Sequence, residues 1–320
     1  MTANRGFHPA AMKGDLLGAH SLDTFGFSVP DLTQAAAFHI AFGLDVIERD
    51  NALEVRTSPG GHVWARIEEG ARKALGYLSF GCFEEDLPRF RARLLESGVA
   101  EVSPPPGLES NGIWFRDPDG TVIEIKVAPK TSPDAKQHGR LDSSPPGIAG
   151  APKRSRAGDV LPTRMSHILL FTSDVNRAVG FYTRVIGLGL SDRAGSNIAF
   201  LHGRHGSDHH MVAFVKSNGP GIHHTSWDVP TIHDVGLGAM VMADRGFDRG
   251  WGLGRHVLGS NYFHYVRDPW GSYAEYSCDM DYVPRDRDWE AGDHDDEDAF
   301  YVWGPNPPAD FGVNHEVEGR

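Results

Sequence analysis

Apolar and polar residues alternate with a period of two in many short stretches of the chain, which is the spacing of half-buried β-strands. The stretches LDTFGFSV (22–29) and MSHILLFT (165–172) are predicted to be strands of this kind. Each is followed by a segment with the 3.6-residue spacing of an amphipathic helix, which starts at an Asp (Asp31 or Asp174) and ends at a Gly. Asp and Gly are typical residues for the first and last positions of a helix, so the pattern predicts an α+β fold.

The same order of elements occurs twice along the chain. The segments FRDPDGTVIEIK (115–126) and VRDPWGSYAEYS (266–277) both contain a strand, an Arg-Asp-Pro-x-Gly turn and a second strand with a central Glu. The two capping Asp residues lie 143 positions apart, and Glu124 and Glu275 lie 151 positions apart. We therefore expect tandem βαβββ modules that form open β-barrels, each with a further helix before its last two strands, at 86–98 and 231–246.

Composition divides the chain into five segments. These are an N-terminal extension (1–18), an N-terminal βαβββ domain (19–127), a linker (128–162), a C-terminal βαβββ domain (163–280) and a C-terminal tail (281–320). The linker is rich in Pro, Gly, Ser and basic residues, so we expect it to cross the surface without a core of its own. The acidic part of the tail is expected to be solvated. Its aromatic part, with Trp303, Pro305 and Phe311, is expected to dock on a surface or on a neighbouring subunit of a homo-oligomer.

Charge and cysteine content exclude several functions. The net charge is -12, but residues 280–320 alone carry twelve Asp and Glu against three Arg, so the acidity belongs mainly to the tail. This charge balance argues against a nucleic-acid partner. The chain has neither a secretory signal pattern nor an apolar run long enough to span a membrane, so we expect a cytoplasmic protein with no membrane partner. Cys82 and Cys278 are too few for a disulfide framework or a thiolate zinc site.

Histidine carries the clearest chemical signal, because ten of the 17 His residues lie between positions 162 and 279. In the C-terminal module, His167 lies on the first predicted strand, His224 on the strand GIHHTSWDV and Glu275 on the last strand. An open barrel brings inward side chains of separate strands together, so we predict that these three residues bind one metal. Two imidazoles and one carboxylate form the facial set that binds Fe(II), or Mn(II), and leaves about three octahedral positions free.

The first module provides a control within the chain. Alignment on the turn and the helix pairs His167 with Thr24, His224 with Tyr77 and Glu275 with Glu124, so this module keeps only the acid. The duplicated fold therefore does not need the two histidines. Alternation along the strand puts His224 in phase with Ser226 and Asp228, and it assigns His223 to the other face as a packing or hydrogen-bonding residue.

Two further segments, HMVAF (210–214) and GRHVLGSNYFHYVRDPWGSYAEY (254–276), complete a known pattern. With the three ligand positions, they resemble the catalytic module of type I extradiol ring-cleavage dioxygenases of the vicinal oxygen chelate superfamily, and the resemblance covers residues 19–280. It implies that His167, His224 and Glu275 bind Fe(II), that His210 is the acid/base, and that His256 and Tyr265 point at the substrate. It also implies a catecholic small molecule and O2 as substrates, with both oxygen atoms inserted next to the diol, in the breakdown of aromatic compounds.

His209 competes with His210 for the inward position. We select His210, because under this resemblance it is in phase with Val212 and Phe214. The remaining polar and aromatic residues of the module have weaker signals: we expect His202 and His205 in a solvated turn, His264 facing away from Tyr265, Ser260 and Asn261 near the pocket, and Trp227 and Trp270 in packing roles.

Two alternatives of the same fold remain open from the sequence. The first is a metal-dependent glyoxalase-like isomerase or a transferase acting on an antibiotic. Such enzymes usually build the metal site from both modules, and Thr24 and Tyr77 do not offer ligands for that. The second is a drug-binding protein, which needs no metal and would keep its ligand after the loss of iron. The sequence does not identify the catechol.

Overall fold

The computed structural model describes residues 16–58, 60–137, 143–285 and 288–317, and most of its strands lie in two large sheets. The first half of the chain forms β1 (Ser21–Val29), α1 (Leu32–Ala41), β2 (Asp45–Arg49), β3 (Ala52–Arg56), β4 (Val63–Glu69), β5 (Ala74–Cys82), η2 (Glu84–Asp86), α2 (Leu87–Glu96), β6 (Ile113–Arg116) and β7 (Val122–Val127). Its seven strands form one sheet in the order β2-β3-β4-β1-β5-β7-β6.

The second half begins after η3 (Arg154–Arg156). It forms β8 (Arg164–Thr172), α3 (Val175–Phe181), the π-helical turn η4 (Tyr182–Ile186), β9 (Gly189–Ala194), β10 (Ile198–His202), β11 (Ser207–Asp208), β12 (Val212–Lys216), β13 (Gly221–Asp228), α4 (Ile232–Asp244), β14 (Gly250–His256), β15 (Tyr262–Arg267) and β16 (Tyr273–Cys278). The tail adds β17 (Tyr282–Val283), β18 (Gly292–Asp293), η5 (Asp296–Asp298) and β19 (Tyr301–Trp303). The second sheet has the order β18-β9-β10-β12-β8-β13-β16-β15-β14-β19, and β11 pairs separately with β17.

Each half contains two strand-helix-strand units where the sequence pattern predicts one. In the second half these are β8-α3-β9-β10-β12 and β13-α4-β14-β15-β16, and in the first half they are β1-α1-β2-β3-β4 and β5-α2-β6-β7. The further helix predicted near the end of each module is therefore the helix of a second unit. In the described part of the chain, the second unit of the first half has no strand equivalent to β14, and this difference affects the site.

The predicted helix caps are confirmed. The Asp31 carboxylate accepts a hydrogen bond from the backbone N–H of Gln34, and Asp174 does the same for Arg177. Helix α3 continues into η4, and Gly187 ends that turn in the left-handed conformation, with a φ of 79°, which favours Gly.

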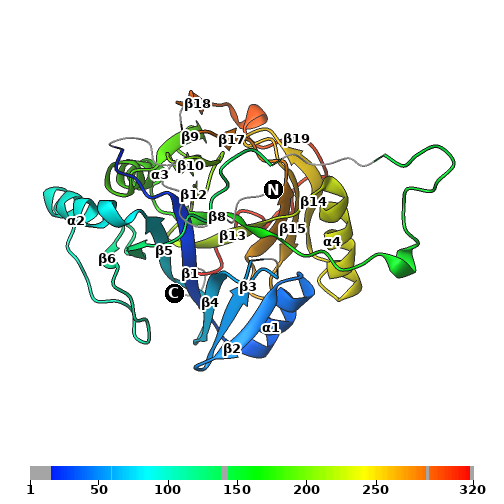
Figure 1. Cartoon of the computed structure of the whole chain (residues 1–320), viewed down its shortest axis with the longest axis horizontal. Coiled ribbons are helices and arrows are strands. Elements are labelled where there is room, and N and C mark those ends of the chain that lie inside the picture. The colour runs from blue at the N-terminus through cyan, green and yellow to red at the C-terminus, as the bar shows by residue number, and fades with distance from the viewer. Residues whose placement is uncertain (1–15, 59, 138–142, 286–287, 318–320) are drawn as a thin grey trace.

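The two halves share one apolar core, and helices α1 to α4 lie on the outside of the molecule (Figure 1). The rings of Phe42 and Tyr276, one from each half, stack with their centroids 3.8 Å apart, and the Tyr276 hydroxyl donates to the Phe42 carbonyl. None of the helices in the described ranges has the length and apolar content that a transmembrane helix needs.

The linker and the tail are more ordered than the composition suggests. At the two ends of the linker, Lys130, Thr131 and Val160 are buried, so these ends pack against the sheets. In the tail, β18 pairs with β9 and β19 pairs with β14, so these two strands extend the sheet of the second half. Residues 1–15 of the predicted N-terminal extension lie outside the described residues.

Candidate metal centre and active-site cavity

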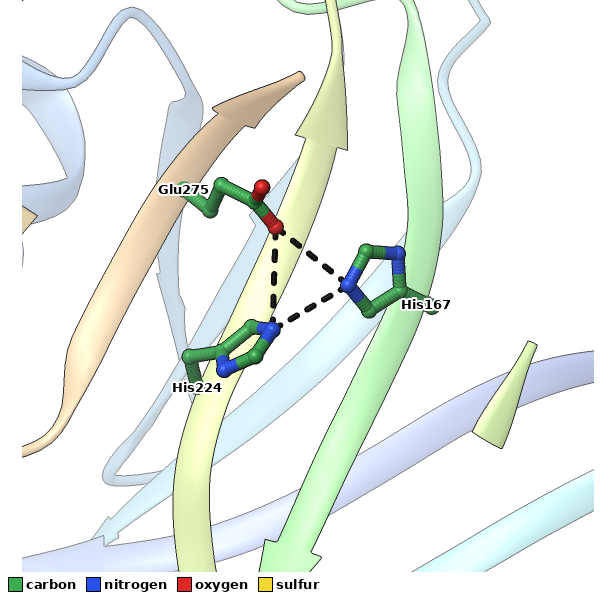
Figure 2. A group of neighbouring side chains, drawn as sticks. All are labelled: His167, His224 and Glu275. Atoms are coloured by element: carbon green, nitrogen blue, oxygen red, sulfur yellow. Dashed lines mark hydrogen bonds and ion pairs between the residues drawn. The ribbon is translucent and has the colours of Figure 1, made fainter. Parts of the chain in front are cut away.

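Three side chains from three neighbouring strands converge in the second half of the chain (Figure 2). His167 comes from β8, His224 from β13 and Glu275 from β16, and each is at most 3% exposed. Nε2 of His167 lies 3.1 Å from Nε2 of His224 and 3.3 Å from Oε2 of Glu275, and Nε2 of His224 lies 3.6 Å from the same oxygen. The structure thus brings together the three predicted ligands.

Strand register explains this convergence. Ser226 of β13 lies opposite His167 on one side and opposite Glu275 on the other, because β13 pairs with both β8 and β16. His224 precedes Ser226 by two residues and so lies on the same face of the sheet. Side chains at these positions can meet only on that face, where all three are buried.

The donor set fits a six-coordinate divalent ion. Ligand atoms about 2.1 Å from an octahedral ion lie roughly 3.0 Å apart when they share one face, close to the three distances above. Oε2 of Glu275 is buried and makes no hydrogen bond with the described residues. Nε2 of His167 and Nε2 of His224 also face each other directly, and no acceptor from the described residues lies between them. A cation bound by all three atoms would satisfy each of them.

A second contact orients each imidazole. Nδ1 of His167 lies 3.3 Å from Oγ of Ser166, and Nδ1 of His224 lies 2.7 Å from Nδ1 of His223. Burial lowers the pKa of His224 well below its ordinary value and lowers that of His223 to about 4, so both rings are neutral at pH 7. The backbone of Phe311 also forms a hydrogen bond with His223. Contacts of this kind fix which ring nitrogen is free to bind a metal.

Glu275 is held as a carboxylate. Burial by itself would raise its pKa, but the neighbouring imidazoles of His167, His256 and His224 hold the pKa well below its ordinary value. Nδ2 of Asn261, a residue that the sequence places near the pocket, donates to Oε1 of Glu275 at 3.2 Å and to Ser277 at 2.9 Å. This leaves Oε2 for the metal position.

A cavity of about 330 Å³ opens from the two histidine ligands, His167 and His224. Its polar end contains imidazole, amide and phenol groups, from His167, His210, His223, His224, His256, Asn261 and Tyr265. The rest of the wall is apolar, from Leu169, Ile198, Phe200, Val215, Leu258, Ala299, Phe300, Pro307, Pro308, Phe311 and Gly312. Among the described residues no Lys, Arg, Asp or Glu lines it. This is the usual character of a small-molecule site, apolar with a few convergent polar groups.

The tail forms one wall of this cavity. Phe300 and Phe311 line the cavity, and the ring of Phe311 packs against Tyr265 with the centroids 5.1 Å apart. Nε1 of Trp251 donates to the carbonyl of Pro305, while Trp303 is 42% exposed. Pro305 and Phe311 therefore contact their own chain, next to the site.

The three residues assigned by resemblance all lie at the polar end. His210 lines the cavity, and burial, with the charges of His167 and other histidines, lowers its pKa well below the ordinary value. Nδ1 of His256 donates to the Phe300 carbonyl at 2.8 Å, so its Nε2 accepts a hydrogen bond from the Tyr265 hydroxyl at 2.9 Å. Burial and the Glu275 charge raise the pKa of Tyr265, so this phenol keeps its proton.

Two predictions from strand alternation are wrong. Phe214 packs against Tyr182, away from the cavity, and it is Val215 that lines the cavity, so His210 does not share a face with Phe214. His210 precedes β12 and is therefore not bound by the alternation of that strand. His223 does line the cavity, because the register of β13 against β8 shifts between Ile222 and His224.

Other candidates take structural positions. His202 and His205, expected in a solvated turn, are buried, and Nδ1 of His202 lies 2.7 Å from Oγ of Ser191. Ser260 donates to Asp281 and does not line the cavity. The expected packing roles hold for Trp227, which is 1% exposed, and for Trp270, which packs against the core. No local pattern in the sequence pointed to Asp192, Phe200, Leu258 or Phe300 as residues near the site.

Comparison with known proteins identifies the family. Residues 164–276 match the family model described as the Glyoxalase/Bleomycin resistance protein/Dioxygenase superfamily. The chain is 50% identical to Metapyrocatechase 2 of Cupriavidus necator over 298 residues, which are 93% of each chain. An Mn(II)-bound glyoxalase from Novosphingobium aromaticivorans is similar in fold, with a TM-score of 0.73 and 24% identity, over 91% of this chain and 93% of that one. Homoprotocatechuate 2,3-dioxygenase from Brevibacterium fuscum has a TM-score of 0.73 and 19% identity, over 95% of each chain.

The two kinds of comparison agree with the resemblance drawn from the sequence. The structural neighbours share the tandem fold, and the relative from Cupriavidus necator matches nearly the whole chain, including the module without ligands. The predicted fold class and family are thus confirmed, and the family implies a catalytic metal ion. The chain belongs to the extradiol ring-cleavage dioxygenases of the glyoxalase/bleomycin resistance protein/dioxygenase superfamily.

Proposed function

We propose that His167, His224 and Glu275 hold Fe(II) and that the chain cleaves the ring of a catechol next to its diol, inserting both atoms of O2. The observation that carries this proposal is a buried face of two imidazoles and one carboxylate at the end of an apolar cavity. The 50% sequence identity with Metapyrocatechase 2 supports the same reaction. Both oxygen atoms enter the ring-opened product, a hydroxy-oxo acid or semialdehyde, so no other reductant is required.

The ligand charges suit this chemistry. When bound, Fe(II) can take both oxygens of a vicinal diol and still has a position for O2. Two neutral imidazoles and one carboxylate give a divalent site a net charge of about +1, which attracts a diol that has lost a proton. Mn(II) accepts the same ligands, and the choice of Fe(II) is part of the proposal.

His210 acts as the base in this proposal. Its ring is neutral at pH 7 and lines the cavity beside His167, with the ring centroids 4.2 Å apart. It can therefore accept a proton from a hydroxyl of the diol and return it later as an acid.

Tyr265 and His256 orient the substrate. The Tyr265 hydroxyl keeps its proton and donates a hydrogen bond to Nε2 of His256. A substrate oxygen that gains negative charge is a stronger acceptor and would compete for this hydrogen bond, which stabilises the charge as it develops.

The apolar wall indicates the substrate class. We infer that the chain favours catechols with an uncharged alkyl or aryl substituent over those with a carboxylate. A substituent on the diol ring would contact the side of the cavity made by Phe200, Leu258 and Phe311, where a carboxylate would lose its hydration without gaining a cation.

Oxygen uptake after anaerobic reconstitution tests the proposal. The protein is loaded with Fe(II) or Mn(II), exposed to air and given catechol, 3-methylcatechol, 2,3-dihydroxybiphenyl or 3,4-dihydroxyphenylacetate, with His224→Ala as the matched control. We expect one molecule of O2 to be consumed for each molecule of yellow product. Turnover should be fastest with the uncharged substrates, and the control should consume no O2. Iron bound by the wild-type chain without oxygen uptake on any diol would contradict the proposal. The homo-oligomer and the cytoplasmic location stay predictions.

A further inference from the structure

A buried carboxylate lies behind the cavity, one histidine away from His210. Asp192 on β9 is 6% exposed and accepts four hydrogen bonds. The donors are Nε2 of His209 at 2.7 Å, Nε2 of His294 at 2.8 Å, the backbone N–H of Gly292 at 2.8 Å and Nε1 of Trp289 at 3.3 Å. Burial alone would raise the pKa of Asp192, but the hydrogen bonds from His209 and His294 lower it to about 2, so Asp192 is ionised at neutral pH.

The contact continues from Asp192 to the cavity. His209 is fully buried, and its Nδ1 lies 3.0 Å from Nδ1 of His210. An ionised carboxylate only accepts hydrogen bonds, so Nε2 of His209 carries its proton. A neutral imidazole has one N–H, so Nδ1 of His209 is an acceptor. The hydrogen bond between the two rings then requires the proton of His210 to be on Nδ1, which leaves the lone pair on Nε2.

We propose that Asp192 and His209 are positioning residues that fix the ring tautomer of His210, so that its Nε2 is an acceptor for the diol proton. This inference rests on the proposed function of His210. It also explains the pair of adjacent histidines at 209 and 210: one faces the cavity, and the other connects it to an ionised carboxylate.

A second His-His pair has the same construction. Nδ1 of His223 lies 2.7 Å from Nδ1 of His224, and the backbone of Phe311 hydrogen-bonds to His223. In this pair the free Nε2 of His224 points at the metal position instead of the substrate. In both pairs an acceptor binds the outer ring (His209 or His223), and this determines which nitrogen of the inner ring (His210 or His224) carries no proton. Supporting contacts have the same effect on metal-bound histidines.

The tail supplies most of the hydrogen bonds to Asp192. Three of the four donors to Asp192, those of Trp289, Gly292 and His294, come from the tail. The acidic part of the tail, expected to be solvated, therefore takes part in holding a carboxylate behind the active site.

A double-mutant cycle tests the proposal on the iron-loaded full chain. We expect Asp192→Asn to lower kcat by roughly 10- to 100-fold, with iron content and KM for 3-methylcatechol unchanged. In a His210→Gln background the same substitution should have no further effect, because Asp192 acts through His210. Asp117 is a half-buried carboxylate that accepts a hydrogen bond from Tyr182 and does not line the cavity, so Asp117→Asn serves as the matched control and should keep wild-type kcat.

Three results would overturn the inference. These are wild-type kcat in Asp192→Asn, an equal loss in the His210→Gln background, and a change in KM without a change in kcat. If Asp192→Asn does not fold, His209→Phe, which removes both hydrogen bonds at similar size, is judged by the same criteria. A His210→Gln protein with full turnover would instead contradict the proposed role of His210, so the two failures are distinguishable.

Discussion

The two halves of the chain have the same skeleton and different chemistry at the same positions. Ser79 of the first half lies opposite both Thr24 and Glu124, as Ser226 of the second half lies opposite His167 and Glu275. This register confirms the alignment made from the sequence. It also pairs Trp114 with Tyr265, which lie opposite Glu124 and Glu275. Counting back along the chain from these registers aligns Val63 with His210 and Ser110 with Asn261.

The acid common to both halves has opposite surroundings. Glu124 accepts hydrogen bonds from the hydroxyls of Ser79 and Ser110, and the ammonium of Lys126 lies 3.9 Å from it. Every oxygen of this carboxylate is therefore satisfied by the protein. In the second half Glu275 keeps one buried oxygen without a hydrogen bond. The fold accepts a buried Glu on this strand in either setting, and the residues around it decide whether a metal can bind.

The first half also lacks part of the cavity wall. Among the described residues it has no strand equivalent to β14, which carries His256 in the second half, and no strand of the tail joins its sheet. The comparison therefore separates what the fold requires from what the reaction requires, and replacing second-half residues by their first-half counterparts tests that separation.

The largest effect is expected from His167→Thr, which copies the first half at a ligand position. The loss of one imidazole should remove bound iron and reduce ring cleavage by more than about 1000-fold, because the metal contributes several kcal/mol to catalysis. Metal analysis and circular dichroism check this. A His167→Thr protein with full iron content would contradict the ligand assignment.

His210→Val, again the first-half residue, should keep iron and lose turnover. Removal of a general base typically lowers the rate by roughly 10²- to 10⁴-fold. Oxygen uptake at saturating catechol gives kcat, and the iron content is measured on the same sample. Loss of iron with the same variant would mean that His210 has a ligand role.

Tyr265→Phe removes one hydroxyl and keeps the ring that packs on Phe311. We expect kcat to fall by roughly 10²-fold, since a hydrogen bond to developing charge is lost. KM should change little. An unchanged kcat would reduce Tyr265 to a packing residue, like its counterpart Trp114.

Phe311→Ala opens the wall that the tail provides. For 2,3-dihydroxybiphenyl we expect KM to rise by roughly 5- to 30-fold, since about 1–2 kcal/mol of apolar contact is lost. For catechol itself, which lacks the second ring, the rise should be much smaller. Steady-state kinetics on the two substrates check this, and equal effects on both would contradict a contact between the substituent and the tail.

The smallest effect on activity is expected from Glu124→Gln in the first half. Iron content and kcat should stay at wild-type values, because this acid binds no metal. The free energy of unfolding should fall by about 1–3 kcal/mol, because the buried carboxylate that accepts hydrogen bonds from two hydroxyls is lost. Urea denaturation measures the change. A Glu124→Gln protein with reduced iron would show that the halves are not independent.

The sequence pattern predicted those helices and strands whose formation depends on residues close together in the chain. Helix caps such as Asp174 and the alternation around His167 are readable because the deciding contacts lie within a few positions. The triad was predictable because its members lie on strands in register, and the duplication supplied the comparison with Thr24. The resemblance to a known family added His210 and His256.

The remainder depends on contacts between distant parts of the chain. Phe311 reaches the cavity only because the tail folds back over β14, and Asp192 lies behind His209 only through the pairing of separate strands. The shift in register beside His223 has no signature in the sequence. The second unit of each half was not recognised because, in the first half, it has lost one strand.

The central claim is that the second half of the chain catalyses insertion of O2 into a diol ring. Mass spectrometry of the product formed from catechol under ¹⁸O₂ tests it most directly, with immediate borohydride reduction to prevent exchange of the aldehyde oxygen with water. We predict two labelled oxygen atoms in each product molecule formed by the iron-loaded wild-type chain, and no product from His224→Ala. A product with one labelled atom, or with none, would contradict ring cleavage by dioxygen insertion.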